Sequence, residues 1–378
     1  IRGASELNRE DRHDLLVGYV NNLAKNLGSM PAALTMIAWA NANAYSKKLF
    51  EAYGFFPFLF MWGRHAKGKT TLIKWLMATY GMQDIGYASL PNLGTGVGFA
   101  RNMSVFSSVP MCLDEVRADQ QTKNFYGHFR AWYNRQGRTL GVKGNQTKVH
   151  TQEVRSTLIL GGQDVLTDAA TRSRCIEVQI PTNGREMQES YVWMEQRVDD
   201  FRWIGFDWIQ EAAHIEVGPL LEALRSHEKE IVADVHCDSR VAKHWAMVSF
   251  FGQRIAAKCN IDIDFLSYAK EACAQSVVDQ EEENCVLTSD HIALDGDNLV
   301  LWMTELIRLV KQKGGSIMNE GERFSKNAIL KMLQDEPYYV ECKRHYMGNR
   351  KAQRRAYVLS GNLPAPLENI KKIAALYS

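Results

Sequence analysis

The stretch GRHAKGKTT, residues 63–71, decides how the chain folds. Its first and sixth residues are glycine, and lysine and threonine directly follow the second glycine, which is the spacing of a phosphate-binding loop. A wholly apolar run, FFPFLFMW (55–62), precedes the loop, and TTLIKWLMATYG (70–81) follows it with the apolar spacing of a helix. The sequence therefore predicts a buried strand, a glycine-rich loop and the N-terminus of a helix in succession.

This succession predicts that the loop binds a nucleotide. Backbone N–H groups and the positive end of the helix dipole would face the phosphates, Lys69 would reach the β and γ oxygens, and the Thr70 hydroxyl would ligate Mg²⁺. The alternative is an ordinary strand-to-helix turn without a ligand. We therefore expect ATP and Mg²⁺ as cofactors. The predicted nucleotide-binding residues of the loop are Gly63, Arg64, His65, Ala66, Lys67, Gly68, Lys69, Thr70 and Thr71.

Length and composition are those of a globular protein with two or three domains: 378 residues, 46% apolar and 23% charged. The longest apolar run is well short of the ~18 residues of a membrane span, and the N-terminus lacks the apolar segment of a signal peptide. We therefore expect an intracellular protein without a membrane partner. The seven cysteines form no CxxC pair, which argues against a disulfide framework or a structural zinc site. The chain opens at Ile1, so a further N-terminal part is expected.

The order of apolar patterns predicts an α/β fold with a parallel sheet. Two helices are predicted at 11–27 and 31–50, strand-like runs alternate with helical patterns from 55 to 181, and aromatic-rich helical patterns follow between 186 and 280. The acidic segment DQEEEN, 279–284, is predicted to be a solvated linker. The expected domains are a helical lead-in (1–50), a P-loop ATPase core (51–185), a helical lid (186–285) and a C-terminal domain (286–378).

A second motif supplies carboxylates for a metal and for water. The run VPMCLDEV, 109–116, is an apolar strand that ends in Asp114 and Glu115. Asp114, with Thr70, would hold Mg²⁺ and its water shell, and Glu115 would polarise the attacking water in a step that depends mainly on positioning and charge stabilisation. The alternative is two exposed carboxylates after a strand. We therefore predict hydrolysis of the nucleotide, with Lys69 and Glu115 as catalytic residues.

Two further strand-like runs carry candidate catalytic groups. The run STLILGGQD ends in polar residues that could touch the γ-phosphate or the attacking water, with Gln163 preferred and Asp164 as the alternative. In ATRSRCIEVQI, arginines directly precede the last apolar strand, and Arg174, with Arg172 as its competitor, is the candidate there. The alternative for Arg174 is a surface cation beside a strand.

In this order the motifs resemble an AAA+ ATPase module that covers about residues 30–250. The phosphate-binding loop corresponds to Walker A, the Asp-Glu pair to Walker B, and the SRC that contains Arg174 resembles the arginine-finger motif of clamp-loader ATPases. Where such ATPases usually offer Asn, Ser or Thr as a sensor, this chain has Gln163. The resemblance implies that the arginine acts on the nucleotide of a neighbouring subunit and that the protein is a homo-hexamer.

A predicted β-hairpin separates the Asp-Glu strand from the sensor strand, because RTLGVKG and KVHTQEV flank the turn GNQT. The hairpin is similar to the pre-sensor hairpin of superfamily 3 and minichromosome-maintenance helicases, which implies that Lys143, Lys148 and His150 follow DNA phosphates through the channel of a ring. The alternative is a solvated surface hairpin. The stretches LPNLGTGVGFARNMSVFSSVPMCLDE and RAWYNRQGR also resemble the helicase halves of phage and mobile-element primase-helicases, which implies a preceding primase-polymerase or regulatory domain.

The C-terminal domain is predicted to be a degenerate winged helix. A helix at 298–312, a second helix from Ser325 and two strands within 338–359 follow one another. The two strands enclose a basic tip with no acidic residue, which is an electrostatic pattern for binding DNA phosphates. The alternative is a basic wing that binds a protein or nothing. The basic residues of this hairpin are Lys343, Arg344, Arg350, Lys351, Arg354 and Arg355.

Together these features favour an ATP-driven ring helicase that moves along DNA in the replication of a phage or mobile element. A non-unwinding AAA+ switch, such as an origin initiator, a loader or a transposition regulator, is the second hypothesis. A defence or signalling NTPase is the third. The predicted hairpin favours the helicase, since loaders and signalling ATPases usually lack it.

Overall fold

The computed structural model describes residues 7–63, 68–83, 86–93, 96–117, 119–142, 145–180, 188–284, 292–295, 297–302, 337–345, 354–360 and 371. They belong to two compact units, 1–279 and 280–378, and each unit is described by itself. Within these ranges no helix has the length and apolar character needed to cross a membrane.

The first unit is built on a five-stranded parallel sheet. Its strands are β1 (Phe58–Trp62), β2 (Tyr87–Ser89), β3 (Pro110–Val116), β6 (Thr157–Gly162) and β7 (Cys175–Gln179). They lie in the order β2-β3-β6-β1-β7, and every neighbouring pair is parallel. The predicted α/β class with a parallel sheet is confirmed. All carboxyl ends meet at one edge of the sheet, which is where open parallel sheets bind their ligands.

Alternate residues of the strands enter two different apolar cores. The helices that connect the strands are α4 (Lys69–Ala78), η1 (Leu90–Asn92), α5 (Gly96–Val105), α6 (Gln120–Tyr133) and α7 (Ala169–Arg172). Leu59 and Met61 of β1 lie in one core with side chains of α4, whereas Phe58 and Phe60 lie in the other with side chains of α5 and α6. This is the period-2 alternation of a strand that is covered on both faces.

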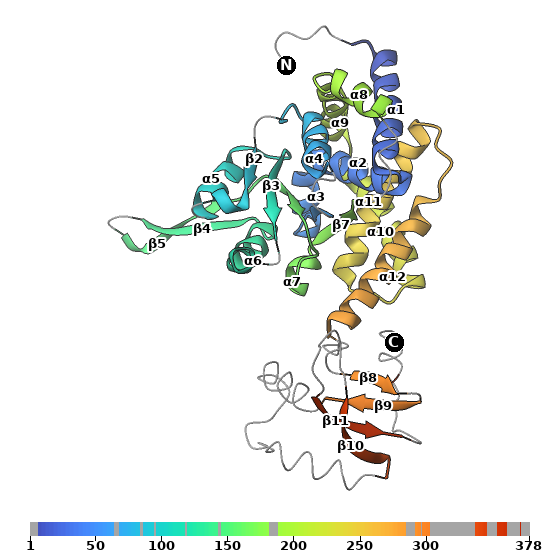
Figure 1. Ribbon diagram of the computed structural model, residues 1–378. Coiled ribbons are helices and arrows are strands. Elements are labelled where there is room, and N and C mark those ends of the chain that lie inside the picture. The colour runs from blue at the N-terminus through green and yellow to red at the C-terminus, as the bar shows by residue number, and fades with distance from the viewer. Residues whose placement is uncertain are drawn as a thin grey trace. The chain divides into compact units, whose positions relative to one another are not determined.

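Helices from both ends of the first unit share the α4 side of the sheet. They are α1 (Arg9–Leu27), α2 (Met30–Ala44), α3 (Ser46–Tyr53), α8 (Gln188–Gln196), α9 (Arg202–His214), α10 (Val217–Asp234), α11 (Ser239–Lys258) and α12 (Phe265–Asn284). Figure 1 shows these helices on one side of the first unit, with α5 and α6 on the other. Every residue of α2 from Ala32 to Ala44 is buried, because α1, α9 and α11 surround it.

The helices agree with the predicted pattern except at two places. The predicted helix at 31–50 is interrupted at Tyr45, where α2 ends and α3 begins. The acidic segment 279–284, predicted to be a solvated linker, is helical, since α12 continues to Asn284. The boundary between the two units falls at the start of this segment, between residues 279 and 280, and glutamate, a good helix former, extends α12 into it.

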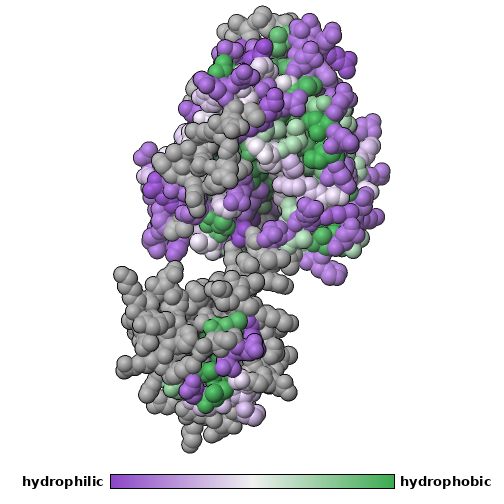
Figure 2. All heavy atoms as spheres, turned by 45° about the vertical axis from the view of Figure 1, so that its right-hand side comes forward, coloured by the Kyte–Doolittle hydropathy of each residue, from purple (hydrophilic) through white to green (hydrophobic). Residues whose placement is uncertain are grey.

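The surface of the first unit is mainly hydrophilic, with apolar side chains scattered among polar ones on the face that Figure 2 shows. The large apolar side chains that are exposed in the described part of this unit are Val105, Tyr191, Val192, Ile209 and Val232. Single exposed apolar residues are normal for a globular protein.

The predicted hairpin is present, and its root is fixed to the body of the first unit. The predicted turn GNQT is misplaced, because β5 begins at Asn145 and includes Gln146 and Thr147. Strands β4 (Gln136–Val142) and β5 (Asn145–Glu153) pair antiparallel between α6 and β6. The backbone N–H groups of Arg155 and Ser156 both donate to the Met103 carbonyl of α5 at 2.9 Å. The Gln152 amide donates to the Ser104 hydroxyl at 2.8 Å. In Figure 1 the hairpin extends from the side of the unit that carries α5 and α6.

The second unit contains a four-stranded antiparallel sheet in the order β10-β11-β9-β8. Its strands are β8 (Ile292–Asp295), β9 (Asn298–Leu301), β10 (Tyr339–His345) and β11 (Arg354–Leu359). The two strands predicted within 338–359 are confirmed. The helix predicted to begin at 298 was wrong there, because NLVL is a strand that pairs antiparallel with IALD, and short apolar runs fit either state. The predicted helix from Ser325 lies outside the described residues.

Candidate active site

The two glycines that bound the predicted phosphate-binding loop lie where the sequence predicts, one after a strand and one before a helix. Gly63 directly follows β1, and its N–H donates to the Gly162 carbonyl of β6 at 3.2 Å. A Cβ at Gly63 would lie 2.8 Å from the Ile180 carbonyl oxygen, so this close approach requires glycine. Gly68 precedes α4 with φ +77°, a left-handed conformation that glycine adopts at no steric cost. Between them, Arg64, His65, Ala66 and Lys67 lie outside the described residues.

The Lys69 side chain reaches from the start of α4 back to Gly63, where the loop begins. It is the first residue of α4, and its Nζ donates to the Gly63 carbonyl at 2.5 Å. Burial lowers the pKa of Lys69, and the negative charges of Asp114 and Asp164 partly offset this effect. The structure therefore brings the ammonium group of Lys69 close to carboxylates from the ends of two other strands.

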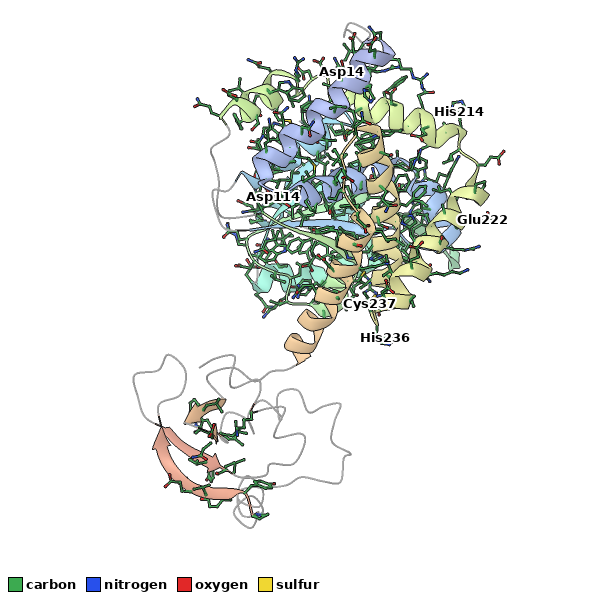
Figure 3. The ribbon with its side chains drawn as sticks, turned by 90° about the vertical axis from the view of Figure 1, so that its right-hand side faces the viewer. Asp14, Asp114, His214, Glu222, His236 and Cys237 are labelled. Carbon is green, nitrogen blue, oxygen red and sulfur yellow. The ribbon has the colours of Figure 1, made fainter. Side chains whose placement is uncertain are left out.

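Asp114 is the most tightly held side chain at this edge of the sheet. Only 4% of the residue is exposed, and Figure 3 shows it inside the first unit. Its Oδ2 accepts hydrogen bonds from the Thr70 hydroxyl at 3.0 Å and the Tyr87 hydroxyl at 2.5 Å, and its Oδ1 accepts one from the Glu115 N–H at 2.8 Å. A Cβ at Gly161 would lie 2.3 Å from Oδ1, so glycine leaves room for the carboxylate. The predicted pair of Thr70 and Asp114 is thus in direct contact.

Glu115 lies beside Asp114 in a different environment. Its φ is +61°, an uncommon conformation for a residue other than glycine, and the register of β3 against β6 shifts at this point. Such strained backbone is a known feature of functional sites. The Glu115 side chain is exposed, and its Oε2 accepts a hydrogen bond from the Ser89 hydroxyl at 2.5 Å. Arg117 Nη2 lies 3.9 Å from Oε1. The carboxylate therefore faces solvent but is restrained by the end of β2.

Both candidate sensor residues follow β6 at the same edge of the sheet. Gln163 is partly buried, whereas Asp164 is exposed and its charge raises the pKa of Lys69. Of the two candidates, Asp164, which the sequence analysis gave as the alternative sensor residue, therefore interacts electrostatically with Lys69. The assignment of a sensor role to Gln163 stays a prediction.

The donor set at this site fits Mg²⁺ held jointly with phosphate. Among the described residues no group of three His, Cys, Asp or Glu side chains could hold a metal ion. Other labelled titratable residues in Figure 3, such as Asp14, His214 and Glu222, lie toward the outside of the first unit. Mg²⁺ is usually held by one or two protein oxygens together with substrate phosphates. The Thr70 hydroxyl and the Asp114 carboxylate would supply that small number of oxygens.

The two candidate arginines differ in what they contact. Arg172 Nε and Nη2 donate to the two carboxylate oxygens of Glu177 at 2.6 and 3.2 Å, so its guanidinium is held within its own subunit. Arg174 lies over the ring of Tyr133, 5.3 Å from the centre, and donates to the Ala170 carbonyl. Within the described residues Arg174 forms no ion pair, and its buried Nε has no hydrogen-bond partner. These contacts make Arg174 the better candidate of the two arginines for contacting phosphate.

A second arginine, which the sequence did not reveal, lies beside Arg174. Arg240, near the start of α11, donates from Nη1 to the Ser173 hydroxyl at 3.3 Å and likewise forms no ion pair in the described part of the chain. Burial and then the positive charge of Arg240 lower the pKa of Arg174. Burial, with the charges of both arginines, lowers the pKa of nearby His244 to about 3, so that ring is neutral. The positive charges of Arg174 and Arg240 therefore lie near each other, and neither arginine forms an ion pair with a described carboxylate.

The predicted DNA-binding residues are placed only in part. Lys148 and His150 are in β5, and Arg344, Arg354 and Arg355 are in β10 and β11, but their side chains lie outside the described part. Their contact with DNA stays a prediction. Lys143, Arg350 and Lys351 lie outside the described residues altogether, and Lys343 is described only as part of β10.

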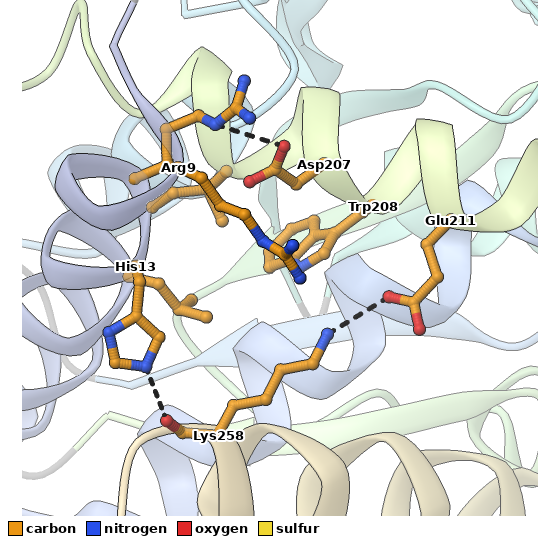
Figure 4. A pocket seen from close by; sticks show the side chains of 9 residues that line it. Arg9, His13, Asp207, Trp208, Glu211 and Lys258 are labelled. Carbon is orange, nitrogen blue, oxygen red and sulfur yellow. Dashed lines mark hydrogen bonds and ion pairs between the residues drawn. The ribbon is translucent and has the colours of Figure 1, made fainter.

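A cavity of about 500 Å³ lies elsewhere in the first unit, between α1, α9 and α11. Figure 4 shows that its charged side chains face one another. Arg12 Nε lies 3.4 Å from Asp207 Oδ1, and Lys258 Nζ lies 3.2 Å from Glu211 Oε2. His13 Nε2 lies 2.9 Å from the Lys258 carbonyl oxygen. These pairs tie the first helix of the chain to α9 and α11, and we assign the cavity a structural role.

Comparison with known proteins found similarity of structure only. No protein-family profile matches the sequence, and no curated protein matches it. The active helicase Cch of SCCmec type IV is 13% identical, with 98% of this chain and 72% of the helicase covered, at a TM-score of 0.47. The C-terminal region of NrS-1 is 14% identical, with 95% and 78% covered, at 0.32. A Cytophaga hutchinsonii protein provisionally classed as an ATPase is 11% identical, with 71% and 89% covered, at 0.38. None of these scores reaches 0.5, so the likeness says nothing about the chemistry of this chain.

The fit between Gly161 and Asp114 gives a testable prediction. Gly161→Ala places a methyl group 2.3 Å from Oδ1 and should displace the carboxylate. We expect the affinity for Mg²⁺–nucleotide to fall about tenfold or more, measured by Mg²⁺ titration with a fluorescent ATP analogue. Gly98→Ala in α5 is the matched control, because a Cβ there meets nothing within 4 Å. A folded Gly161→Ala protein with wild-type affinity would show that the position of Asp114 does not matter for binding.

Proposed function

We propose that the protein is an Mg²⁺-dependent ATPase that drives a ring-shaped DNA helicase. The observation that carries the proposal is the contact between the Thr70 hydroxyl and the buried Asp114 carboxylate, beside Lys69 at the carboxyl ends of β1 and β3. A hydroxyl, a carboxylate and an ammonium group in this order suit a metal-bound triphosphate. An ordinary strand-to-helix turn has no need of a buried carboxylate that accepts three hydrogen bonds.

Each residue of the site then has a separate task in hydrolysis. Lys69 and the loop N–H groups bind the phosphates. Thr70 and Asp114 hold the metal, which when bound neutralises the negative charge that develops on the phosphates during hydrolysis. Glu115, with an exposed carboxylate one residue from Asp114, accepts a hydrogen bond from the attacking water and orients it. In the described state Ser89 holds one oxygen of Glu115 at 2.5 Å. Glu115 must leave Ser89, or share that oxygen, to reach the water.

Arg174 cannot serve the nucleotide of its own subunit. Its carbonyl oxygen accepts a hydrogen bond from the Phe58 N–H at 3.0 Å, so Arg174 lies at the amino end of β1, whereas the phosphate-binding loop follows the carboxyl end. The five residues of β1 separate these ends by about 16 Å. We therefore propose that Arg174, together with Arg240, contacts the nucleotide of a neighbouring subunit. Closing this contact around a ring gives an oligomer, and six copies are the number that the family resemblance implies.

DNA is the proposed partner of the hairpin and of the second unit. The β4–β5 hairpin is fixed at its root by Met103 and Ser104, so force on its tip would be passed to the body of the protein. Lys143, Lys148 and His150 would contact phosphates in the ring channel, and the basic β10–β11 hairpin would contact the fork or duplex. Replication of a phage or mobile element belongs to the same proposal. The rival is a non-unwinding switch, in which the hairpin lies on the outer surface.

The division of tasks predicts opposite defects for two variants. Lys69→Ala should lose nucleotide binding, because it removes a phosphate contact. Glu115→Gln should keep binding and lose on the order of 100-fold or more in kcat, because it removes only the group that orients water. Equilibrium binding of a fluorescent ATP analogue and steady-state phosphate release measure the two effects. Full turnover by Glu115→Gln would exclude it as the base.

The trans contact predicts complementation between inactive proteins. Arg174→Ala should bind ATP normally and lose on the order of 1,000-fold in kcat, and Arg240→Ala should lose about tenfold. Mixing Arg174→Ala with Lys69→Ala should restore hydrolysis, because some interfaces then pair an intact loop with an intact arginine. Arg225→Ala, an exposed arginine on α10, is the control and should stay active. Mixed rings without restored activity would contradict the trans role.

The hairpin decides between a helicase and a switch. Lys143→Ala with Lys148→Ala should abolish unwinding of a forked DNA and DNA stimulation of hydrolysis, while ATP binding and assembly remain, because the two lysines contribute only phosphate contacts. Strand displacement and DNA-dependent ATPase assays measure both. Lys123→Ala with Lys229→Ala removes two exposed lysines from α6 and α10 and serves as the control. Wild-type unwinding by the hairpin variant would make the switch the better hypothesis.

A further inference from the structure

Asp114 also accepts a hydrogen bond from a tyrosine that belongs neither to the predicted phosphate-binding loop nor to the strand that carries Asp114 and Glu115. The Tyr87 hydroxyl lies 2.5 Å from Asp114 Oδ2, which is shorter than the 3.0 Å between Thr70 Oγ1 and the same oxygen. The other oxygen, Oδ1, accepts the Glu115 N–H and has no room on the side of Gly161. The orientation of the carboxylate plane is therefore fixed by donors on both oxygens, and Tyr87 provides the shortest of these bonds.

The sheet places Tyr87 where only a long side chain with a polar end can donate a hydrogen bond to the Asp114 carboxylate. Strand β2 runs parallel to β3, with Tyr87 opposite Cys112 and Ser89 opposite Asp114. Tyr87 thus starts two residues before the carboxylate along the strand, a distance of about 7 Å. Its partly buried ring packs against the core that contains Leu72 and Cys112, and only the hydroxyl reaches the site. Burial and the charge of Asp114 raise the pKa of Tyr87, so the hydroxyl is a donor at neutral pH.

We propose that Tyr87 is a positioning residue that sets the affinity of the site for the metal–nucleotide complex. Its hydroxyl holds Asp114 in the rotamer in which Oδ2 accepts the Thr70 proton, so that the lone pairs of Thr70 Oγ1 would be left for the metal. Tyr87 touches neither the phosphates nor the attacking water in this role. The inference rests on the proposed ATPase function, because it assigns Tyr87 to the same metal site.

Tyr87→Phe tests the role, since it keeps the ring and removes only the hydroxyl. With the full chain, binding of a fluorescent ATP analogue is measured in a Mg²⁺ titration and, separately, in EDTA. We expect the Mg²⁺ concentration at half-saturation to rise about tenfold, the range seen when partners of metal ligands are removed, with no change in EDTA. Tyr126→Phe is the matched control, because its hydroxyl contacts Thr167, away from the site, at 2.9 Å. A thermal unfolding scan checks that each variant is folded.

Four results would overturn the role of Tyr87 alone. An unchanged Mg²⁺ midpoint would mean that the hydroxyl does not orient Asp114. A lower midpoint would mean that Tyr87 occupies the place of a metal-bound water instead of supporting the site. Equal weakening in Mg²⁺ and EDTA, or the same shift in Tyr126→Phe, would mean a general packing effect. If the wild-type protein bound the nucleotide equally well with and without Mg²⁺, or not at all, the proposed function itself would fail and the inference with it.

Discussion

The buried carboxylate of Asp114 is the constraint on which the rest of the site depends. A charge in the interior is costly unless hydrogen bonds replace its water, and Asp114 gains three donors: the Thr70 hydroxyl of α4, the Tyr87 hydroxyl of β2 and the N–H of Glu115. These donors come from separate elements of the sheet and its first helix. The position of α4 relative to β2 and β3 is therefore tied to one side chain, and Gly161 keeps the remaining space open for it.

The same strand end gives two adjacent carboxylates different chemistry. In regular strands neighbouring side chains point to opposite faces, but the positive φ of Glu115 and the register shift in β3 interrupt that alternation. Asp114 is left buried with three hydrogen bonds, and Glu115 is left exposed, with Ser89 and Arg117 beside it. A pair of carboxylates in unlike surroundings can divide the work of holding charge and of activating water. The strain in the backbone is the structural cause of that division.

The sequence predicted what local chemistry determines and missed what distant parts of the chain bring together. The strand before Gly63, the helix that begins at Lys69 and the strand that carries Asp114 follow from spacing and apolar runs, and all three are present in the structure. Strand β2 has only three residues and no periodic signal, so Tyr87 and Ser89 could not be recognised before its pairing with β3 was known. Arg240 comes near Arg174 only because α11 packs back toward the start of β7. The helix predicted at 298–301, where the structure has a strand, is an error of another kind, since these four residues suit either a helix or a strand.

One short part of the chain connects Glu115 with the root of the hairpin. Strand β2 provides Ser89, which restrains Glu115. Helix α5, which follows β2 and η1, provides Met103, whose carbonyl accepts the N–H groups of Arg155 and Ser156 where the chain returns from β5 to the sheet. A hairpin that moved at its root would either break these two hydrogen bonds or carry α5 with it. Because α5 follows β2 closely, displacement of the helix would pull on the strand end that holds Glu115. The fold thus links the root of the hairpin to Glu115 through two hydrogen-bonded contacts that residues 89–103 join along the chain.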